Sequence, residues 1–197
     1  DLLTDDDRTV IGNTTPKFSG GFGLNATFKG FDVSAFFNFM YDFDVFNANK
    51  VMMTTWASNN YNNFSMDISA AKRWRNFDDM GNEIRYSPEI LAEFNKNATM
   101  WNPTSIGRPI AMSYAVEDGS FLRLNTATIG YTLPRAWTNK VGLSRVRFYA
   151  SGYNLFTITG YSGYDPEVDI ATGLTPNIDN NRYPRSRTYT FGVQLTF

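Results

Sequence analysis

The chain has 197 residues and contains no cysteine and no histidine. The absence of cysteine excludes a disulfide framework, and the absence of both residue types excludes a Cys/His zinc site. Without histidine there is no Ser-His-Asp triad and no histidine general base. We therefore expect no catalytic residues, no resident metal and no cofactor, and we do not expect the chain to be an enzyme.

Acidic residues leave two weak alternatives open. Asp78 and Glu83 could suggest glycoside hydrolysis, but any two acids in a loop would do the same. Calcium is the second alternative, and neither acidic run that could bind it has the spaced pattern of a calcium loop. The two runs are Asp5, Asp6 and Asp7, and Asp165, Glu167 and Asp169. We favour solvated loop carboxylates over either kind of site.

The chain also lacks an excess of basic residues and any long apolar run. Its net charge of -1 provides no basic stripe to neutralise phosphates, so no nucleic-acid partner is expected. No run of about 18 apolar residues exists, which excludes a transmembrane helix. The first residues, DLLTDDDRTV, have neither the positive start nor the apolar core of a signal peptide. They read like the middle of a loop, so we expect that Asp1 is not the natural start.

What the chain does have is apolar residues at every second position. This pattern predicts antiparallel strands with one apolar face, and it occurs in five segments, at about 17–28, 31–43, 120–133, 144–158 and 186–197. Lys29 and Gly30 separate the first two segments as a two-residue hairpin turn. The third segment changes parity near Asn125, which predicts a bulge or a change of environment there.

The length of these segments favours a membrane. Strands in soluble proteins are usually about 5 or 6 residues long, whereas a tilted strand that crosses a bilayer needs about 9 to 11. Phe18 and Phe28 are 10 residues apart, or about 34 Å along a strand and roughly 26 Å along the membrane normal at a tilt of about 40°. Aromatic residues gather at both expected rims, as in lipid-facing barrels: Phe28, Phe31, Tyr131 and Phe197 at one, and Phe18, Tyr41, Phe43, Phe156 and Tyr189 at the other. A soluble β-sandwich is the alternative, because it has the same period.

Short and long connections alternate between the strands. The connections 29–30 and 134–144 are short, whereas 44–119 and 160–185 are long inserts. Membrane barrels have short periplasmic turns and long extracellular loops, so we expect both inserts to be extracellular. Five strands cannot close a barrel, and an open edge in lipid is costly. The chain must then be the C-terminal piece of a larger barrel or pair with another polypeptide.

Four stretches resemble the end of a SusC/RagA-type TonB-dependent transporter. They are DRTVIGNTTPKFSGGFGLNATFKGFDVSAFF (7–37), VEDGSFLRLNTATIGYTLP (116–134), RVRFYASGYNLFTITGYSGYDPEV (145–168) and YPRSRTYTFGVQLTF (183–197). The resemblance implies an all-β fold, formed by the C-terminal five antiparallel strands of a large, about 22-stranded transmembrane β-barrel. It implies TonB-dependent import of glycan fragments or peptides across the outer membrane of Bacteroidetes-type bacteria. A passive porin or an adhesin-type barrel is the alternative, and a soluble carbohydrate-binding sandwich is the third possibility.

The resemblance also implies partners. A SusD-like surface lipoprotein would act as a lid, and the TonB-ExbB-ExbD complex would act through a segment absent from this chain. The signal peptide, the TonB box and the plug would also lie in that missing part. The final strand resembles the outer-membrane signal that the barrel-assembly machinery reads, and its residues are Tyr189, Phe191, Val193, Leu195 and Phe197. A last strand exposes an edge until the barrel closes, although Phe197 could also be a simple rim anchor facing outer-membrane lipid.

Aromatic residues of the inserts are the candidates for substrate binding. Flat rings with polar tips can stack on sugar rings or peptide side chains, although loop aromatics more often hold a loop together. The candidates are Trp56, Tyr61, Trp74, Trp101, Tyr161 and Tyr164. The stretch SPEILAEFNKN (87–97) predicts a short helix with a serine cap and proline in its first turn. By parity, Arg123, Arg145 and Arg147 are expected to face the lumen.

Overall fold

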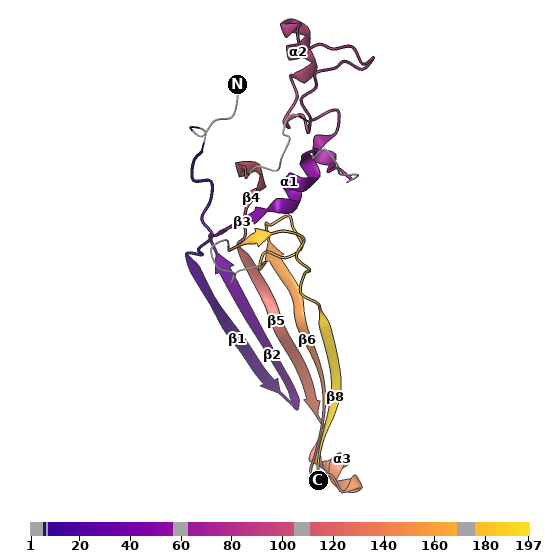
Figure 1. The fold of residues 1–197 in the computed structure, drawn as a ribbon. Coiled ribbons are helices and arrows are strands. Elements are labelled where there is room, and N and C mark those ends of the chain that lie inside the picture. The colour runs from indigo at the N-terminus through magenta and orange to yellow at the C-terminus, as the bar shows by residue number, and fades with distance from the viewer. Residues whose placement is uncertain (1–5, 7, 57–62, 105–110, 169–175) are drawn as a thin grey trace. The chain divides into compact units, whose positions relative to one another are not determined.

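The computed structural model describes residues 6, 8–56, 63–104, 111–168 and 176–197. These residues form two compact units, which we describe separately. The first comprises 1–45, 116–178 and 182–197, and the second comprises 46–115 and 179–181. Figure 1 shows the strands and helices with the labels used below.

The first unit is built on one five-stranded antiparallel sheet. Its strand order is β1-β2-β5-β6-β8, and Figure 1 shows the five strands side by side. The strands are β1 (Phe18–Phe28), β2 (Phe31–Tyr41), β5 (Phe121–Thr132), β6 (Arg145–Thr159) and β8 (Thr188–Thr196). The predicted all-β antiparallel fold is confirmed, and each of these strands lies within or close to one of the alternating segments.

The turn between β1 and β2 explains why these strands form a tight hairpin. Lys29 and Gly30 have φ angles of 46° and 88°, the left-handed pair that a two-residue primed turn requires. A Cβ at Gly30 would also lie 2.8 Å from the carbonyl oxygen of Thr132 on β5. Glycine is therefore needed both for the turn and for the close approach of the next strand.

The parity change in β5 is a bulge at Asn125, as predicted. Phe36 pairs with Thr126 and Phe37 pairs with Leu124, so Asn125 is the extra residue between them. The pairing of β5 with β6 shifts at the same level, where Asn154 has a φ of 52°. The bulge therefore returns Leu124 to the face that carries Ala127.

Shorter elements accompany the five-stranded sheet. The connection from β5 to β6 contains a helical turn, α3 (Arg135–Thr138), followed by the 3-10 turn η4 (Asn139–Val141). A three-stranded sheet of order β4-β3-β7 is formed by β4 (Val116–Asp118), β3 (Asp44–Asn47) and β7 (Ile178–Asp179). A small apolar core contains Phe43, Val45, Phe121, Tyr161 and Val168, with Met40 packed against it.

Phe43 corrects one expectation. The alternating pattern placed it with Phe39 and Tyr41, but β2 ends at Tyr41 and the next residue, Asp42, has a φ of 60°. This left-handed residue turns the chain, so Phe43 is buried against Phe121 with ring centroids 6.4 Å apart. Phe43 therefore belongs to the core and not to an aromatic rim.

The second unit is irregular and is held by local contacts. It contains α1 (Ala48–Thr54), α2 (Pro88–Asn95) and the 3-10 turns η2 (Met66–Ile68) and η3 (Ser113–Ala115). The predicted helix is present as α2, with Pro88 in its first turn, but the Ser87 side chain makes no capping hydrogen bond. The Asn95 side chain instead fastens the end of α2, because its amide donates to the carbonyl oxygen of Arg75 at 2.9 Å. Among the described residues, no helix has the length and apolar character needed to cross a membrane.

Candidate functional site

One face of the five-stranded sheet is apolar on every strand. Directly paired residues of neighbouring strands share a face, so the pairing register defines this surface, which we call the apolar face. Apart from two glycines it consists of Phe18, Phe22, Leu24, Ala26, Phe28, Phe31, Val33, Ala35, Phe37, Phe39, Tyr41, Leu122, Leu124, Ala127, Ile129, Tyr131, Val146, Phe148, Ala150, Phe156, Ile158, Tyr189, Phe191, Val193 and Leu195. Many of these side chains are exposed, including Phe28 at 70% and Phe191 at 79%. An exposed apolar surface spanning five strands requires an apolar environment to cover it.

Aromatic rings are paired at both ends of this face and in its middle. Phe31 and Tyr131 lie beside the β1–β2 turn with centroids 4.5 Å apart, and Phe18 and Tyr41 lie at the opposite end at 6.4 Å. Phe22 stacks on Phe37 between them at 5.0 Å. The aromatic residues therefore mark both edges of the apolar face.

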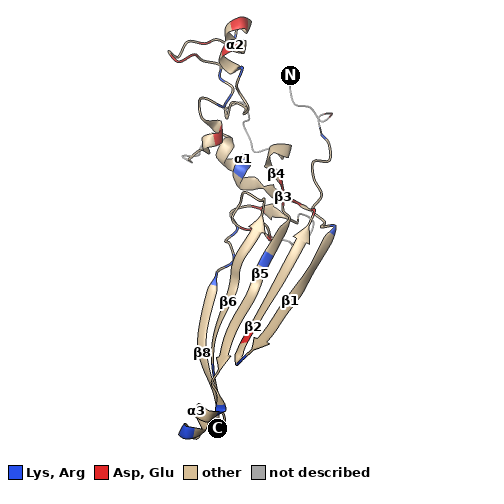
Figure 2. Cartoon of the chain, turned by 180° about the vertical axis from the view of Figure 1, so that it is seen from behind, with Lys and Arg blue, Asp and Glu red and all other residues tan. Residues whose placement is uncertain are grey.

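The other face of the sheet, which we call the polar face, carries every charged residue of the five strands. These residues are Asp32, Arg123, Arg145 and Arg147. Figure 2 shows the strands almost free of charge apart from these positions. Serine, threonine and asparagine occupy much of the remaining polar face, so the two faces differ in chemistry along their whole length.

Asp32 and Arg147 form a two-pronged ion pair across this face. Nε of Arg147 donates to Oδ1 of Asp32 at 2.9 Å, and a second guanidinium nitrogen donates to Oδ2. The two residues belong to β2 and β6, so the pair passes over β5, which lies between them. A Cβ at Gly130 of β5 would lie 2.6 Å from both Oδ1 of Asp32 and Nε of Arg147. Glycine at 130 is therefore a condition for this ion pair.

A second charged cluster is buried on the polar face at the end of the sheet away from the β1–β2 turn. Arg123, only 2% exposed, donates to Asp165 at 2.5 Å and lies 3.4 Å from Glu167. Arg185 completes the cluster at 2.8 Å from Glu167. Two guanidinium groups thus balance two carboxylates, which is what burial of charge requires. Asp165 and Glu167, considered above as calcium ligands, instead form ion pairs with arginine side chains.

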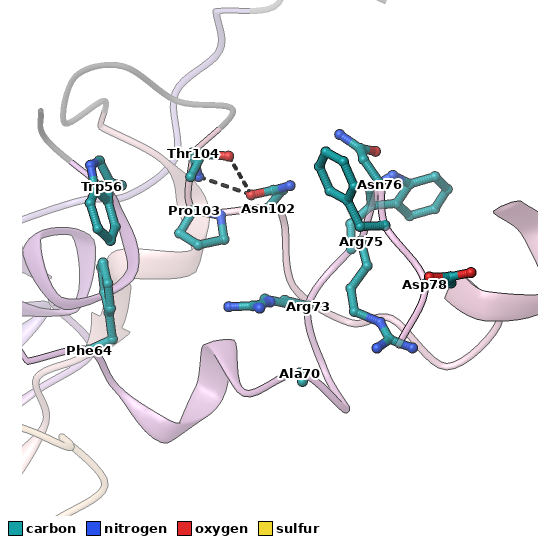
Figure 3. Close-up of a pocket in the computed structure, with 12 residues that line it drawn as sticks. Trp56, Phe64, Ala70, Arg73, Arg75, Asn76, Asp78, Asn102, Pro103 and Thr104 are labelled. Carbon is teal, nitrogen blue, oxygen red and sulfur yellow. Dashed lines mark hydrogen bonds between the residues drawn. The ribbon is translucent and has the colours of Figure 1, made fainter. Parts of the chain in front are cut away.

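The second unit contains a pocket of about 350 Å³. Its lining, drawn in Figure 3, combines four aromatic side chains with two arginines and two asparagine amides. The lining residues are Trp56, Phe64, Ala70, Arg73, Trp74, Arg75, Asn76, Phe77, Asp78, Asn102, Pro103 and Thr104. Trp56 and Phe64 stack with centroids 5.5 Å apart and form one wall. A cavity of this size with aromatic walls and few charges is suited to a small ligand.

Most polar groups of the pocket already have partners. Arg75 pairs with Asp79 at 2.6 Å and lies over the ring of Phe94. Asp78 accepts hydrogen bonds from the side chain and backbone of Asn82, which hold the pKa of its carboxyl below the usual value. Within the described residues, no hydrogen-bond or ionic partner is seen for the guanidinium of Arg73. Arg73 is therefore the pocket charge that remains available.

The comparisons with known proteins identify the kind of protein. No protein-family model matches the chain. The TonB-dependent receptor P3 of Formosa agariphila is 32% identical over 97% of this chain, and the TonB-dependent receptor SusC of Bacteroides thetaiotaomicron is 32% identical over 76%. The chain spans only 17% and 15% of the lengths of these two relatives.

Solved structures give the same result. The RagAB peptide importer in its open-open state matches with a TM-score of 0.70 and 25% identity over 100% of this chain. Its closed-closed state matches with a TM-score of 0.74, and in both cases the match covers 19% of the solved chain. The chain belongs to the SusC/RagA type of TonB-dependent receptors. The five-stranded sheet is the most regular part of this chain's structure.

The residues predicted to bind the receptor's substrate do not lie together. Trp56 and Trp74 both line the pocket. Trp101 packs within the second unit instead, because its indole donates to the carbonyl oxygen of Thr54 at 3.2 Å and its ring meets Tyr114 edge-on. In the first unit, Tyr161 is buried in the core and Tyr164 is 86% exposed. Tyr61 lies outside the described residues, and a binding role for any of these residues stays a prediction.

The residues predicted as the receptor's assembly signal share one surface. Tyr189, Phe191, Val193 and Leu195 lie on the apolar face of β8, which is an outer strand of the sheet. Phe197 follows the end of β8 and is 91% exposed, and its carbonyl oxygen accepts a hydrogen bond from Ser144 at 3.3 Å. Recognition of this strand by an assembly machinery stays a prediction.

Sequence reasoning missed three features of the site. Arg73 and Phe64 were not identified because their neighbours in the pocket are distant along the chain. The Asp32–Arg147 pair was also missed, although Arg147 was assigned to the lumen-facing side by parity. The glycine at 130 inside a strand pattern was the available signal, because such a glycine often marks a close approach.

Proposed function

We propose that this chain forms part of the barrel wall of an outer-membrane receptor that imports a nutrient with energy supplied through TonB. The observation that carries the proposal is the continuous apolar face backed by a polar face with paired charges. Lipid on one side and a wet lumen on the other would suit these two faces. The outer strands β1 and β8 would pair with further strands of the same barrel, since a free edge in lipid is costly.

The orientation follows from the connections. We infer that the β1–β2 turn and the segment 133–144 are periplasmic, and that the inserts 44–119 and 160–185 are extracellular. The receptor would load its substrate from the outside, so the inserts are the parts of this chain that meet ligand or a partner first. The relation to SusC and to a peptide importer supports a glycan fragment or a peptide as the substrate class.

Three partners follow from this proposal. A SusD-like lipoprotein would cap the extracellular side, and TonB-ExbB-ExbD would act through a segment absent from this chain. The barrel-assembly machinery would insert the protein, with β8 as the strand it recognises. The similarity to SusC and to the RagAB assembly supports a lipoprotein partner of this kind. A passive porin or adhesin-type barrel is the alternative function.

The absence of cysteine from the chain allows a direct test of the two faces. Single cysteines placed in the full-length receptor at Val33 and Phe191 should carry spin labels that contact lipid-dissolved oxygen. Labels at the neighbouring positions Ser34 and Thr190 should contact a water-soluble nickel reagent instead. A reversed pattern, or the same accessibility at all four positions, would refute the membrane orientation.

The active and passive alternatives differ in their need for energy. Uptake of the natural substrate should cease in cells that lack TonB, whereas a passive barrel would continue to admit it. Shortening 50–112 to a small linker should leave the barrel assembled but impair uptake or co-purification of the lipoprotein. Normal surface level with both activities unchanged would show that this insert serves neither role.

A further inference from the structure

The pocket of the second unit has a chemistry that narrows the substrate class. Four aromatic side chains surround it, and the rings of Trp56, Trp74 and Phe77 are 48%, 41% and 50% exposed. Exposed flat rings facing a cavity can stack on the apolar face of another ring. Within the described residues 63–104 that form most of the lining, the backbone has only isolated bridges, Arg73 with Met100 and Phe77 with Glu83. A peptide strand would find no sheet edge there to extend, so a compact ring fits better than an extended peptide.

The charges of the pocket select an anionic group on that ring. Among the described lining residues, Asp78 is the one acidic side chain and is hydrogen-bonded by Asn82, and Arg75 is paired with Asp79. This leaves the guanidinium of Arg73, for which no partner is seen among the described residues, and Figure 3 shows it reaching toward the side of Trp56 and Phe64. A guanidinium binds a carboxylate or a sulfate ester through two parallel hydrogen bonds. The Asn76 side chain likewise has no partner within the described part and can bond ring hydroxyls.

We propose that this pocket binds an acidic sugar unit of an incoming glycan, with the ring against the aromatic wall and its anionic group on Arg73. The inference rests on the proposed import function and names its substrate class. The carboxylate of a uronic acid and the sulfate ester of a sulfated sugar present the same charge to Arg73. Asn76 orients the ring, and the engaged residues Arg75 and Asp78 hold the loop that carries both groups.

Calorimetric titration of the purified full-length receptor in detergent tests this site. The probes are trigalacturonate, maltotriose, maltotriose 6-sulfate and tri-glutamate, which separate carboxylate, neutral, sulfate and peptide chemistry. At least one acidic saccharide should bind about tenfold or more tightly than maltotriose, because a charged hydrogen-bonded pair is gained. Preference between the two acidic saccharides would identify the anionic group.

Variants then connect the binding to the pocket. Arg73→Gln should weaken the binding of the acidic saccharide about tenfold, and Arg73→Lys should retain only part of the affinity, because lysine keeps the charge but cannot make the two parallel hydrogen bonds of a guanidinium. Asn76→Ala is a second lining variant that leaves the charge intact and should weaken all bound saccharides. Arg85→Gln is the matched control, because Arg85 lies in the same unit, pairs with Glu83 at 2.5 Å and does not line the pocket.

Several outcomes would overturn the inference. Binding of both trigalacturonate and maltotriose 6-sulfate no tighter than that of maltotriose, no binding of any saccharide, or an unchanged affinity in Arg73→Gln would each do so. Arg73-dependent binding of tri-glutamate alone would assign the pocket to peptides. Uptake in cells with and without TonB separates this result from the import proposal. TonB-dependent uptake that ignores Arg73→Gln refutes only the acidic-sugar site, whereas Arg73-dependent binding without TonB-dependent uptake refutes only the import proposal.

Discussion

The sheet and the segment 46–115 are both rich in aromatic residues, but they use them differently. In the sheet, most rings lie on the apolar face, where they repeat at every second position with no charged residue among them, whereas Phe36, Phe121, Tyr149 and Tyr153 lie on the polar face. In 46–115, aromatic and charged residues are mixed without a period, as in AKRWRNFDDM (71–80). Some of these rings contact a charged group, as Phe94 contacts Arg75, and others contact a second ring, as Trp56 contacts Phe64. Two faces with different surroundings impose a period of two on the sequence of the strands. The irregular backbone of 46–115 imposes no such period.

A charge placed on the apolar face should have the largest effect on stability. Phe37→Arg, near the middle of β2, should lower the free energy of unfolding by about 2 to 4 kcal/mol, which is the cost of a cation facing lipid at midplane. The change also removes the stacking of Phe37 on Phe22. Unfolding of the full-length receptor in lipid vesicles, followed by denaturant titration, measures this loss.

A matched control exists on the same strand. Ser34→Arg adds the same charge to the polar face, between Asn25 and Thr128, and should be much milder. Asn38 is a poorer control because its partner across the strands is Arg123, so a new arginine there would meet a like charge. Equal losses for Phe37→Arg and Ser34→Arg would show that the two faces were assigned wrongly.

A smaller effect is expected on the polar face. Gly130→Ala should cost about 1 to 3 kcal/mol, because the new methyl group collides with the Asp32–Arg147 pair and the side chains must move apart. Gly23→Ala is the control: its Cβ would lie 3.7 Å from the nearest atom, the carbonyl oxygen of Ala35, which is an ordinary contact. The same denaturant titration compares the two variants. A loss no larger for Gly130→Ala than for Gly23→Ala would show that the ion pair adjusts without strain.

These contrasts explain what the sequence could predict. Period 2 located the five strands, and the parity change at Asn125 located the bulge, because both are consequences of side-chain alternation. Burial of Phe43 was missed because it depends on the left-handed conformation of Asp42. Of four residues that line the pocket, Trp56 and Trp74 were predicted as binding candidates, whereas Arg73 and Phe64 were not, because they lie in irregular segments that have no periodic signal. The Asp32–Arg147 ion pair across β5 was not predicted either, because it depends on the pairing register of β2, β5 and β6.

The end of the chain offers a third test of the sheet. Deleting Phe197 removes a residue beyond β8 that is 91% exposed, so the stability of the assembled barrel should change less than in the variants above. The outer-membrane level of the receptor should nevertheless fall, because the final strand loses its terminal aromatic residue during assembly. Quantitative immunoblotting of outer-membrane fractions measures the level. An unchanged level would reduce Phe197 to a dispensable rim residue.

The smallest expected effect concerns acid and the second unit. Asp67 accepts hydrogen bonds from the hydroxyls of Ser65 at 3.0 Å and Tyr114 at 3.2 Å, and the Ser65 bond is the main cause that lowers the pKa of its carboxyl. Because the folded pKa lies below the unfolded one, this contribution to stability is present above about pH 4 and is lost as the pH falls through the folded pKa. The carboxylate is half exposed, so the effect should be modest.

Trp101 provides the readout for this last prediction, because its ring meets Tyr114 edge-on at 5.0 Å. Its fluorescence, isolated by subtracting a Trp101→Phe variant, should change in the wild-type receptor as the pH falls below about 4. In Asp67→Asn the acid-dependent change should be reduced, because no carboxylate remains to be protonated beside Tyr114. Glu93→Gln, which removes an exposed carboxylate paired with Lys96, should behave like the wild type. A wild-type response in Asp67→Asn would contradict this prediction. It would mean that Tyr114 is held by its packing against Trp101 and Lys50 and not by its hydrogen bond to Asp67.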